Sequence, residues 1–305
     1  MFTPKRARGL GVLAVIAASL LITAVAANAA DPGKNGKIAF VTFIGSEQIY
    51  TVKPDGTDLF RVTNLPPSDD GFAFWPDFSP DGKRIVFPHD MTGALELYVI
   101  NADGSGLAQI THDGTFHAAP HWSPDGSHIL FTTTTELGPG VIASIRADGS
   151  ERKVLTSPVW DSGLVAEYTP DGKHIVFESS MDGLVAALWI MDIDGEHKRR
   201  LTDPELEAGP FDVSPGGEYL VTNSNQNTPK PSSIFKVSLR GGLVTRLTSG
   251  HNDGFAVYSP DGKKIAFVTD RNTDGTLDTW MMNADGSGQR LFVEGSGAPN
   301  WGVQP

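Results

Sequence analysis

The feature that most constrains this chain is a short turn, Ser-Pro-Asp-Gly or a close variant, which recurs along most of its length. It stands in HWSPDGSHILF at residues 121–131 and returns in DFSPDGKRIVF, EYTPDGKHIVF, DVSPGGEYLVT and VYSPDGKKIAF. Proline presets φ at the first central position of a turn, and Asp and Gly tolerate the tight geometry that follows. Each copy separates two apolar, β-branched runs, so each predicts a β-hairpin.

The repeat has a regular period. The apolar residues at its equivalent position are Ile38, Ile85, Ile129, Ile175, Leu220 and Ile265, at intervals of 47, 44, 46, 45 and 45 residues. A period near 45 with strand-like runs is typical of the four-stranded blades of a β-propeller. We therefore predict an all-β, six-bladed β-propeller over residues 37–305.

The two ends of the repeat array are complementary. The first unit begins at NGKIAF and lacks the strand that precedes the turn in the other units. The last unit is followed by APNWG, residues 298–302, which matches APHWS at residues 119–123. We predict that this C-terminal strand completes the first blade and closes the ring, because closure removes exposed strand edges.

The first 29 residues are of another kind. Three basic residues precede an Ala/Leu/Val/Ile run over residues 10–25, and Ala27-Asn28-Ala29 fits the small-residue rule for signal cleavage. We predict a signal peptide over residues 1–29 and a short linker over 30–36; an uncleaved membrane anchor is the alternative. Both predict an extracytoplasmic protein, periplasmic or secreted, and cleavage would leave it without stable membrane insertion.

Charge and cysteine content exclude several classes. The chain has no cysteine, which excludes disulfides, thiolate catalysis and cysteine-ligated zinc. Its formal net charge of −12 becomes −15 when the signal segment, with three basic residues and no acids, is removed. Such an acidic domain is poorly suited to nucleic acids and anionic membranes.

The repeated pattern PxWSPDGKxIAF, followed by MNADGSG and RLT, resembles the TolB-like, WD-like propeller family. The resemblance covers essentially all of residues 37–305. It implies a six-bladed wheel outside the cytoplasm whose axial funnel accepts a protein partner of the cell envelope. TolB itself would also carry an N-terminal α/β domain, for which this sequence leaves no room between the signal segment and the first blade.

Chain direction assigns the loops to two rims. The Ser-Pro-Asp-Gly and Ala-Asp-Gly hairpins share one rim, which we call the turn rim. The blade-to-blade segments share the opposite, variable rim and hold twelve acids without one Lys or Arg. We expect an acidic funnel there that binds a protein or another cationic partner; a solvated acidic surface that aids solubility is the alternative. The expected funnel residues are Asp69, Asp70, Asp77, Asp113, His117, His121, Asp161, Glu167, Asp212, His251, Asp253 and Asn300.

One equivalent position in the innermost strands is polar in five of six units. It reads Asp77, His121, Glu167, Asp212, Val257 and Asn300. Radial symmetry should place these side chains at one height near the axis, where they form the centre of the expected funnel. They could hold a divalent cation, or they could simply surround channel water.

A second candidate cation site is the segment DRNTDGTLD. It places Asp270, Asn272, Asp274 and Asp278 at alternating positions, as in a calcium loop. The bidentate glutamate of such loops is missing, because Met281 stands in its place, and the segment lies between strands. Ca²⁺ is therefore one interpretation and a plain hairpin tip is the other.

Catalysis is the competing functional class. His112, His117, His121 and His251 all fall on the predicted variable rim, where histidines and acids could serve a polysaccharide lyase or hydrolase. The chain lacks an arginine cluster to neutralise a uronate, and it has no Gly-x-Ser-x-Gly motif. We therefore assign no catalytic residue and favour a non-catalytic binding scaffold, with the lyase or hydrolase as the alternative.

Overall fold

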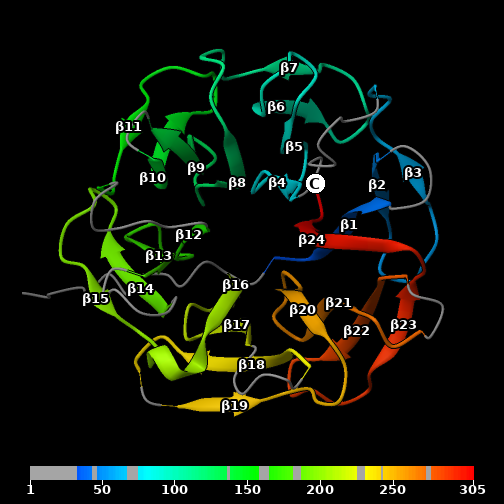
Figure 1. Cartoon of the computed structure of the whole chain (residues 1–305). Coiled ribbons are helices and arrows are strands. Elements are labelled where there is room, and N and C mark those ends of the chain that lie inside the picture. Colours follow the sequence, from blue (N-terminus) through cyan, green and yellow to red (C-terminus); the bar gives the residue numbers. More distant parts are fainter. Residues whose placement is uncertain are drawn as a thin grey trace, which may run out of the picture.

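A computed structural model describes residues 33–42, 47–66, 75–135, 138–157, 165–180, 187–224, 231–241, 243–272 and 276–305. These residues form six four-stranded antiparallel sheets that stand around a central axis (Figure 1). Apart from one 3-10 turn, η1 (Pro204–Leu206), every regular element of the described residues is a strand. The predicted six-bladed β-propeller is confirmed. The predicted signal peptide, residues 1–29, lies outside the described residues.

The blades follow one another in chain order. Blade 1 holds β24 (Ser296–Val303), β1 (Asn35–Thr42), β2 (Ile49–Val52) and β3 (Phe60–Arg61). Blade 2 holds β4 (Asp77–Phe78), β5 (Arg84–His89), β6 (Glu96–Asn101) and β7 (Ala108–Gln109), and blade 3 holds β8 (His117–Trp122), β9 (His128–Thr135), β10 (Gly138–Arg146) and β11 (Lys153–Val154). Blade 4 holds β12 (Ala166–Tyr168), β13 (His174–Ser179), β14 (Ala187–Asp192) and β15 (Arg199–Arg200). Blade 5 holds β16 (Ala208–Val213), β17 (Tyr219–Ser224), β18 (Ser233–Ser238) and β19 (Val244–Arg246), and blade 6 holds β20 (Asp253–Tyr258), β21 (Lys264–Thr269), β22 (Asp278–Asn283) and β23 (Arg290–Val293).

The C-terminal strand closes the ring as predicted. β24 pairs antiparallel with β1, with Ile38 opposite Trp301 and Ala39 opposite Asn300. The red end of the chain therefore lies against its blue beginning, and the C-terminus lies near the axis (Figure 1). β24 takes the innermost place in blade 1, so β1 is paired on both of its edges.

The repeated turn is built by its own side chains. In blade 3, the Ser123 hydroxyl donates to Asp125 Oδ1 at 2.6 Å, and the backbone N–H of His128 donates back to the Ser123 hydroxyl at 2.9 Å. The N–H of Ser127 also donates to the Asp125 carboxylate at 3.0 Å. The side chains thus accept hydrogen bonds from backbone N–H groups of the turn that are not paired with a strand. This explains why Ser or Thr, Pro, Asp and Gly recur together.

The outermost strands are short, and a threonine extends five of the six. The hydroxyls of Thr63, Thr111, Thr156, Thr202 and Thr248 each accept a hydrogen bond of 2.8–3.0 Å from the backbone of the third strand of their blade. All five threonines are buried. This bond continues the ladder where the fourth strand has ended, and it accounts for the threonine of the RLT pattern in the first five blades.

The hydrophobic core lies between adjacent blades. Phe40, Phe87, Phe131, Phe177 and Phe267 occupy the same place in the second strand of five blades and are at most 2% exposed. One core cluster joins Val176 and Leu188 of blade 4 to Val213 and Leu220 of blade 5. Each blade therefore depends on its neighbours to bury its faces, as in other radial repeats.

The innermost strands carry a repeated bulge. Pairing with the second strand shifts register between Ala118 and His121 and between Gly254 and Val257. Ala119 and Phe255, within these bulges, have φ values of 48°. A bulge bends a strand and re-aims its side chains, and here it precedes the polar position that faces the axis.

In the part of the chain that the structure describes, no helix is long and apolar enough to cross a membrane.

Candidate functional site

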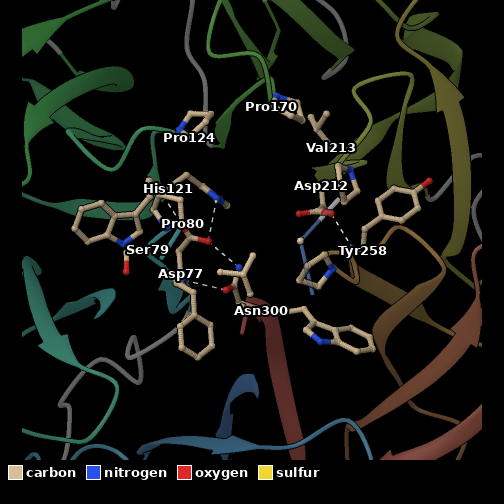
Figure 2. A pocket seen from close by; sticks show the side chains of 18 of the residues that line it. Asp77, Ser79, Pro80, His121, Pro124, Pro170, Asp212, Val213, Tyr258 and Asn300 are labelled. Carbon is tan, nitrogen blue, oxygen red and sulfur yellow. Dashed lines mark hydrogen bonds and ion pairs between the residues drawn. The ribbon is translucent and has the colours of Figure 1, made fainter. Parts of the chain in front are cut away.

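A cavity of about 780 Å³ runs along the propeller axis. Its mouth lies on the turn rim and is framed by prolines of the repeated turns and by the C-terminal residue; these are Pro80, Pro124, Pro170, Pro215, Pro260 and Pro305. Figure 2 looks into this cavity and shows Pro124 and Pro170 on one side of it. The prolines give the mouth an apolar wall, while polar side chains lie deeper.

The five polar residues of the predicted axial position come together in this cavity. Asp77, His121, Glu167, Asp212 and Asn300 all line it, and we call them the axial ring. In Figure 2, Asp77, His121 and Asn300 lie on one side and Asp212 on the other, with their polar ends toward the open centre. Each is partly buried, so each remains in contact with the cavity.

The rim onto which the ring opens differs from our prediction. We expected a funnel on the variable rim, but the cavity that the ring lines is framed by the Ser-Pro-Asp-Gly turns. The reason is the position of the ring in its strands: Asp77 precedes Ser79 of the turn by two residues, about 7 Å along an extended chain. The ring is therefore close to the turn rim.

Toward the variable rim, the axis is narrow and apolar. A small cavity of about 50 Å³ lies there, lined by Trp75, Phe255 and the proline and alanine residues that precede the ring. The rings of Trp75 and Phe255, from blades 2 and 6, lie 6.4 Å apart. His121, Asp212 and Asn300 line both cavities, so the axial ring marks the boundary between them.

The ring side chains also join the blades. Asp77 Oδ2 accepts from the N–H of Trp122 at 2.8 Å, and Asp212 Oδ2 accepts from the N–H of Tyr258 at 2.8 Å. Glu167 Oε2 accepts from the N–H of Val213 at 3.0 Å. In each case the carboxylate of one blade binds the backbone of the next. One oxygen of each carboxylate is thus used by the fold.

Blade 1 continues this pattern across the closure. Asn300 Oδ1 accepts from the N–H of Phe78 at 2.9 Å, and its Nδ2 donates to Asp77 Oδ1 at 2.7 Å. His121 Nδ1 lies 3.8 Å from the same Asp77 oxygen. This half of the ring is therefore a connected polar network, while Glu167 and Asp212 form the more acidic half.

Burial changes the protonation of the ring. It raises the pKa of Asp212 to about 7, against a bond from the Tyr258 N–H that lowers it. Burial, with the neighbouring charges of Asp212 and Asp77, also raises the pKa of Glu167 well above its usual value. The pKa of Asp77 is raised by burial, and that of His121 is lowered by burial. A positive group in the cavity would favour the ionised carboxylates and would be held by them.

The geometry favours a bulky cation over a directly coordinated metal ion. Among the described residues, the ring does not bring three imidazole or carboxylate ligand atoms within 4.8 Å of one another. The carboxylates instead face an open space from different blades. Such a site suits an ammonium or guanidinium group, or a cation that keeps its water shell.

Of the other predicted funnel residues, the four that the structure describes, Asp113, His117, His251 and Asp253, do not line the axial cavity. Asp113 and His117 lie together at the junction of blades 2 and 3, where Nε2 of His117 is 2.9 Å from Asp113 Oδ1. Asp253 is buried and pairs with Arg271 at 2.9 Å, while His251 is exposed. Asp69, Asp70 and Asp161 lie outside the described residues.

The calcium-loop candidate is occupied by contacts within the protein. Asp270 accepts from Asn252, through its backbone N–H at 3.0 Å and its side-chain amide. Asn272 donates to Asp278, whose other oxygen accepts from the N–H of Gly295 at 2.8 Å. Asp274 lies outside the described residues. Asp270, Asn272 and Asp278 thus each have a hydrogen-bond partner within the protein.

Several residues of interest were not predicted. Lys34 lines the axial cavity, and Trp75 and Phe255 narrow it toward the variable rim. Glu96 lies 3.5 Å from His117 Nε2, and Arg152 pairs with Asp113. Only the recurrence of an acidic or amide residue at or directly before the start of the third strand, as in Gln48, Glu96 and Asp278, could have drawn attention to Glu96.

Comparison with known proteins agrees with this architecture. The family described as TolB beta propeller domain matches residues 32–228, more than half of the chain. The chain belongs to this TolB β-propeller family. The TolB homologues of Chlorobaculum tepidum and Chlorobium luteolum are each 33% identical to it, over 27% and 39% of this chain and 20% and 27% of their own lengths. The chain thus matches less than a third of either relative.

A solved TolB structure shows the same fold. TolB from Acinetobacter baumannii superposes with a TM-score of 0.74 at 22% identity, over 87% of this chain and 66% of the other. At this identity the likeness concerns the fold alone. The TolB propeller is thus the shared part, and the residues of the axial ring must be interpreted from their own geometry.

Proposed function

We propose that this TolB-family propeller is an extracytoplasmic binding scaffold whose axial cavity receives a cationic segment of a protein partner of the cell envelope. The observation that carries the proposal is the set of three carboxylates, Asp77, Glu167 and Asp212, at the inner end of a cavity of about 780 Å³. A lysine or arginine side chain entering from the turn rim would meet all three.

The wall of the cavity supports a peptide as the occupant. The mouth presents proline rings and the aromatic residues Trp122, Tyr168 and Trp301, which offer apolar contact. The inner end is acidic and partly buried, so a charge pair there would be less screened by salt than one on the surface. Apolar walls with a few convergent polar groups are typical of binding sites.

Export is the second part of the proposal. It rests on the basic, apolar and small-residue pattern of residues 1–29, and it expects the mature chain to begin at Ala30. Mass spectrometry of the N-terminal peptide from the exported protein checks this. Recovery of an intact Met1 peptide from the membrane fraction would favour the uncleaved anchor.

Peptide binding can be tested with a defined probe. We expect a fluorescein-labelled hexalysine peptide to raise its fluorescence anisotropy on addition of the mature protein, and less so at high salt. The variants Glu167→Gln and Asp212→Asn keep the acceptor for the next blade and remove charge, so both should weaken binding by about tenfold or more.

The matched control is Glu151→Gln, because Glu151 is exposed and remote from the cavity. It removes the same charge and should bind the peptide like the wild type. Equal weakening by Glu151→Gln and Glu167→Gln would assign binding to the overall negative charge and would reject the axial cavity as the site.

A further inference from the structure

We propose that Glu96, Asp113 and His117 form a binding site for Zn²⁺ at the junction of blades 2 and 3. Glu96 begins β6, His117 begins β8, and Asp113 lies in the segment that leads from blade 2 into blade 3. None of them lines the axial cavity, so this site is independent of the proposed peptide site.

The three ligand atoms already stand at suitable separations. His117 Nε2 lies 2.9 Å from Asp113 Oδ1 and 3.5 Å from Glu96 Oε2, and all three atoms lie within 4.8 Å of one another. With Zn–N and Zn–O bonds near 2.1 Å, two ligands of a tetrahedral site are about 3.4 Å apart. The cluster needs only small adjustments to place an ion at its centre.

One buried oxygen in the cluster has no donor. Glu96 is 2% exposed; its Oε1 accepts from the N–H of Gly114 at 2.7 Å, but its Oε2 has no hydrogen-bond partner among the described residues. His117 Nε2 lies closer to Asp113 than to Glu96, so a proton on Nε2 would be donated to Asp113. Burying a carboxylate oxygen without a hydrogen-bond donor costs free energy of folding. A cation bound to His117 Nε2 would contact both carboxylates at once.

The imidazole is suited to coordination. His117 is fully buried, with its ring edge-on to Phe131 at 5.2 Å, so the ring is held in place. An imidazole nitrogen is a common ligand of Zn²⁺. Coordination through Nε2 leaves the proton on Nδ1, which is buried without a described partner, so the bonds to the ion must offset that cost.

Other side chains hold Asp113 in place. Arg152 pairs with its Oδ2, and Nη2 of Arg152 donates to Thr133 at 2.9 Å. Thr115 donates to Oδ1 through its hydroxyl at 2.7 Å. Partners of this kind orient ligands in metal sites. The side chains of Asp113 and Arg152 are 38% and 32% exposed, which gives an ion access from solvent.

Co²⁺ is the probe for this site, because four-coordinate Co²⁺ absorbs strongly in the visible. We expect one equivalent of Co²⁺ to produce this absorption in the mature protein and Zn²⁺ to abolish it. Glu96→Gln keeps the acceptor for Gly114, and Asp113→Asn keeps the size of the side chain. Each variant should weaken Co²⁺ binding by at least about tenfold, because even the loss of a residue that only orients a ligand lowers metal affinity by this factor.

The control is His197→Gln. His197 lies 2.8 Å from Asp192 on an exposed hairpin of blade 4 and is the competing place for a metal ion. This variant should retain the full Co²⁺ spectrum. Zinc should also raise the melting temperature of the wild type and of His197→Gln, but not that of Glu96→Gln.

Two outcomes would overturn the proposal. One is wild-type protein that gives no four-coordinate Co²⁺ spectrum; the other is a spectrum that survives both Glu96→Gln and Asp113→Asn. Circular dichroism of the metal-free variants establishes that they are folded. If Glu96→Gln fails to fold, Asp113→Asn decides, because Asp113 is part-exposed and its replacement leaves the core intact.

Discussion

Asp77 and Asn300, which lie 223 residues apart in the chain, are joined by a hydrogen bond of 2.7 Å at the axis of the propeller. Asn300 also accepts from the N–H of Phe78 at 2.9 Å, so its amide binds blade 2 twice. Elsewhere in the ring a carboxylate accepts a hydrogen bond from the backbone N–H of the next blade. Where the two ends of the chain meet, the amide oxygen of Asn300 accepts it instead. The closure therefore avoids a fourth acidic group beside Asp77.

Asn300→Ala should destabilise the closed ring. It removes the acceptor of the Phe78 N–H and the donor to Asp77, and both groups are partly buried. We expect a loss of about 1–3 kcal/mol in the free energy of unfolding, measured by urea denaturation. Asn101→Ala is the control, since Asn101 bonds Ser105 on an exposed turn, and its effect should stay within about 0.5 kcal/mol. Equal effects of the two variants would contradict a special role for Asn300.

Gly36→Ala tests the close approach of β1 to β24. A Cβ at Gly36 would lie 2.1 Å from the carbonyl oxygen of Val303, a backbone atom that cannot move without shifting the closing strand. We expect a loss of about 1–3 kcal/mol in the free energy of unfolding by the same denaturation assay. At Gly254 the nearest atoms to an added Cβ are 3.5 Å away, so Gly254→Ala should be nearly neutral. A stable Gly36→Ala protein would mean that β24 can adjust its position.

The blade number could be predicted because the repeated turn depends on local chemistry, and the closing strand because residues 298–302 match a strand that the first repeat lacks. Ser123, Pro124, Asp125 and Gly126 make the turn through contacts within five residues, so the turn is visible in any single repeat. The direction in which the ring opens was predicted wrongly, although the position of Asp77 two residues before Ser79 of the turn is visible in the sequence. The narrowing of the axis toward the variable rim could not be predicted, because it depends on Trp75 meeting Phe255 from another blade.

Two residues of the candidate zinc site and its surroundings also could not be predicted from the repeat. Asp113 and His117 are four residues apart and were recognised as polar residues of one loop. Glu96 reaches them from β6 of blade 2 and Arg152 from the residue just before β11 of blade 3, at sequence separations that vary with each loop length. Periodicity predicts which residues are equivalent in different blades, but not which unlike residues meet between them.

Asp125→Ala should weaken the turn that defines the repeat. Hydrogen bonds from Ser123 and Ser127 lower the pKa of Asp125 to about 2. This carboxylate therefore contributes stability above pH 4, near its unfolded pKa, and the contribution is lost as the pH falls toward 2. Because Asp125 is largely exposed, we expect a cost of about 1 kcal/mol at pH 7 in urea denaturation. The difference in the free energy of unfolding between the wild type and Asp125→Ala should shrink at pH 2. A constant difference would mean that the hydrogen bonds to the Asp125 carboxylate are not the source of the stability.

Asp212→Asn should change the pH dependence of the free energy of unfolding in the direction opposite to that of Asp125→Ala. The pKa of Asp212 is raised to about 7 in the folded protein, while an unfolded aspartate titrates near 3.9. Between these values the folded state keeps a proton that the unfolded state releases, so wild-type stability falls as the pH rises from 4 to 7. The side-chain amide of the variant would keep the bond from the Tyr258 N–H but cannot titrate. We expect the variant to gain on the order of 2–4 kcal/mol relative to the wild type over this range, measured by denaturation at several pH values. His121 titrates in both proteins and cancels in the comparison, whereas Glu167 does not cancel fully, because the charge of Asp212 contributes to its raised pKa. Parallel stability curves would contradict the raised pKa of Asp212.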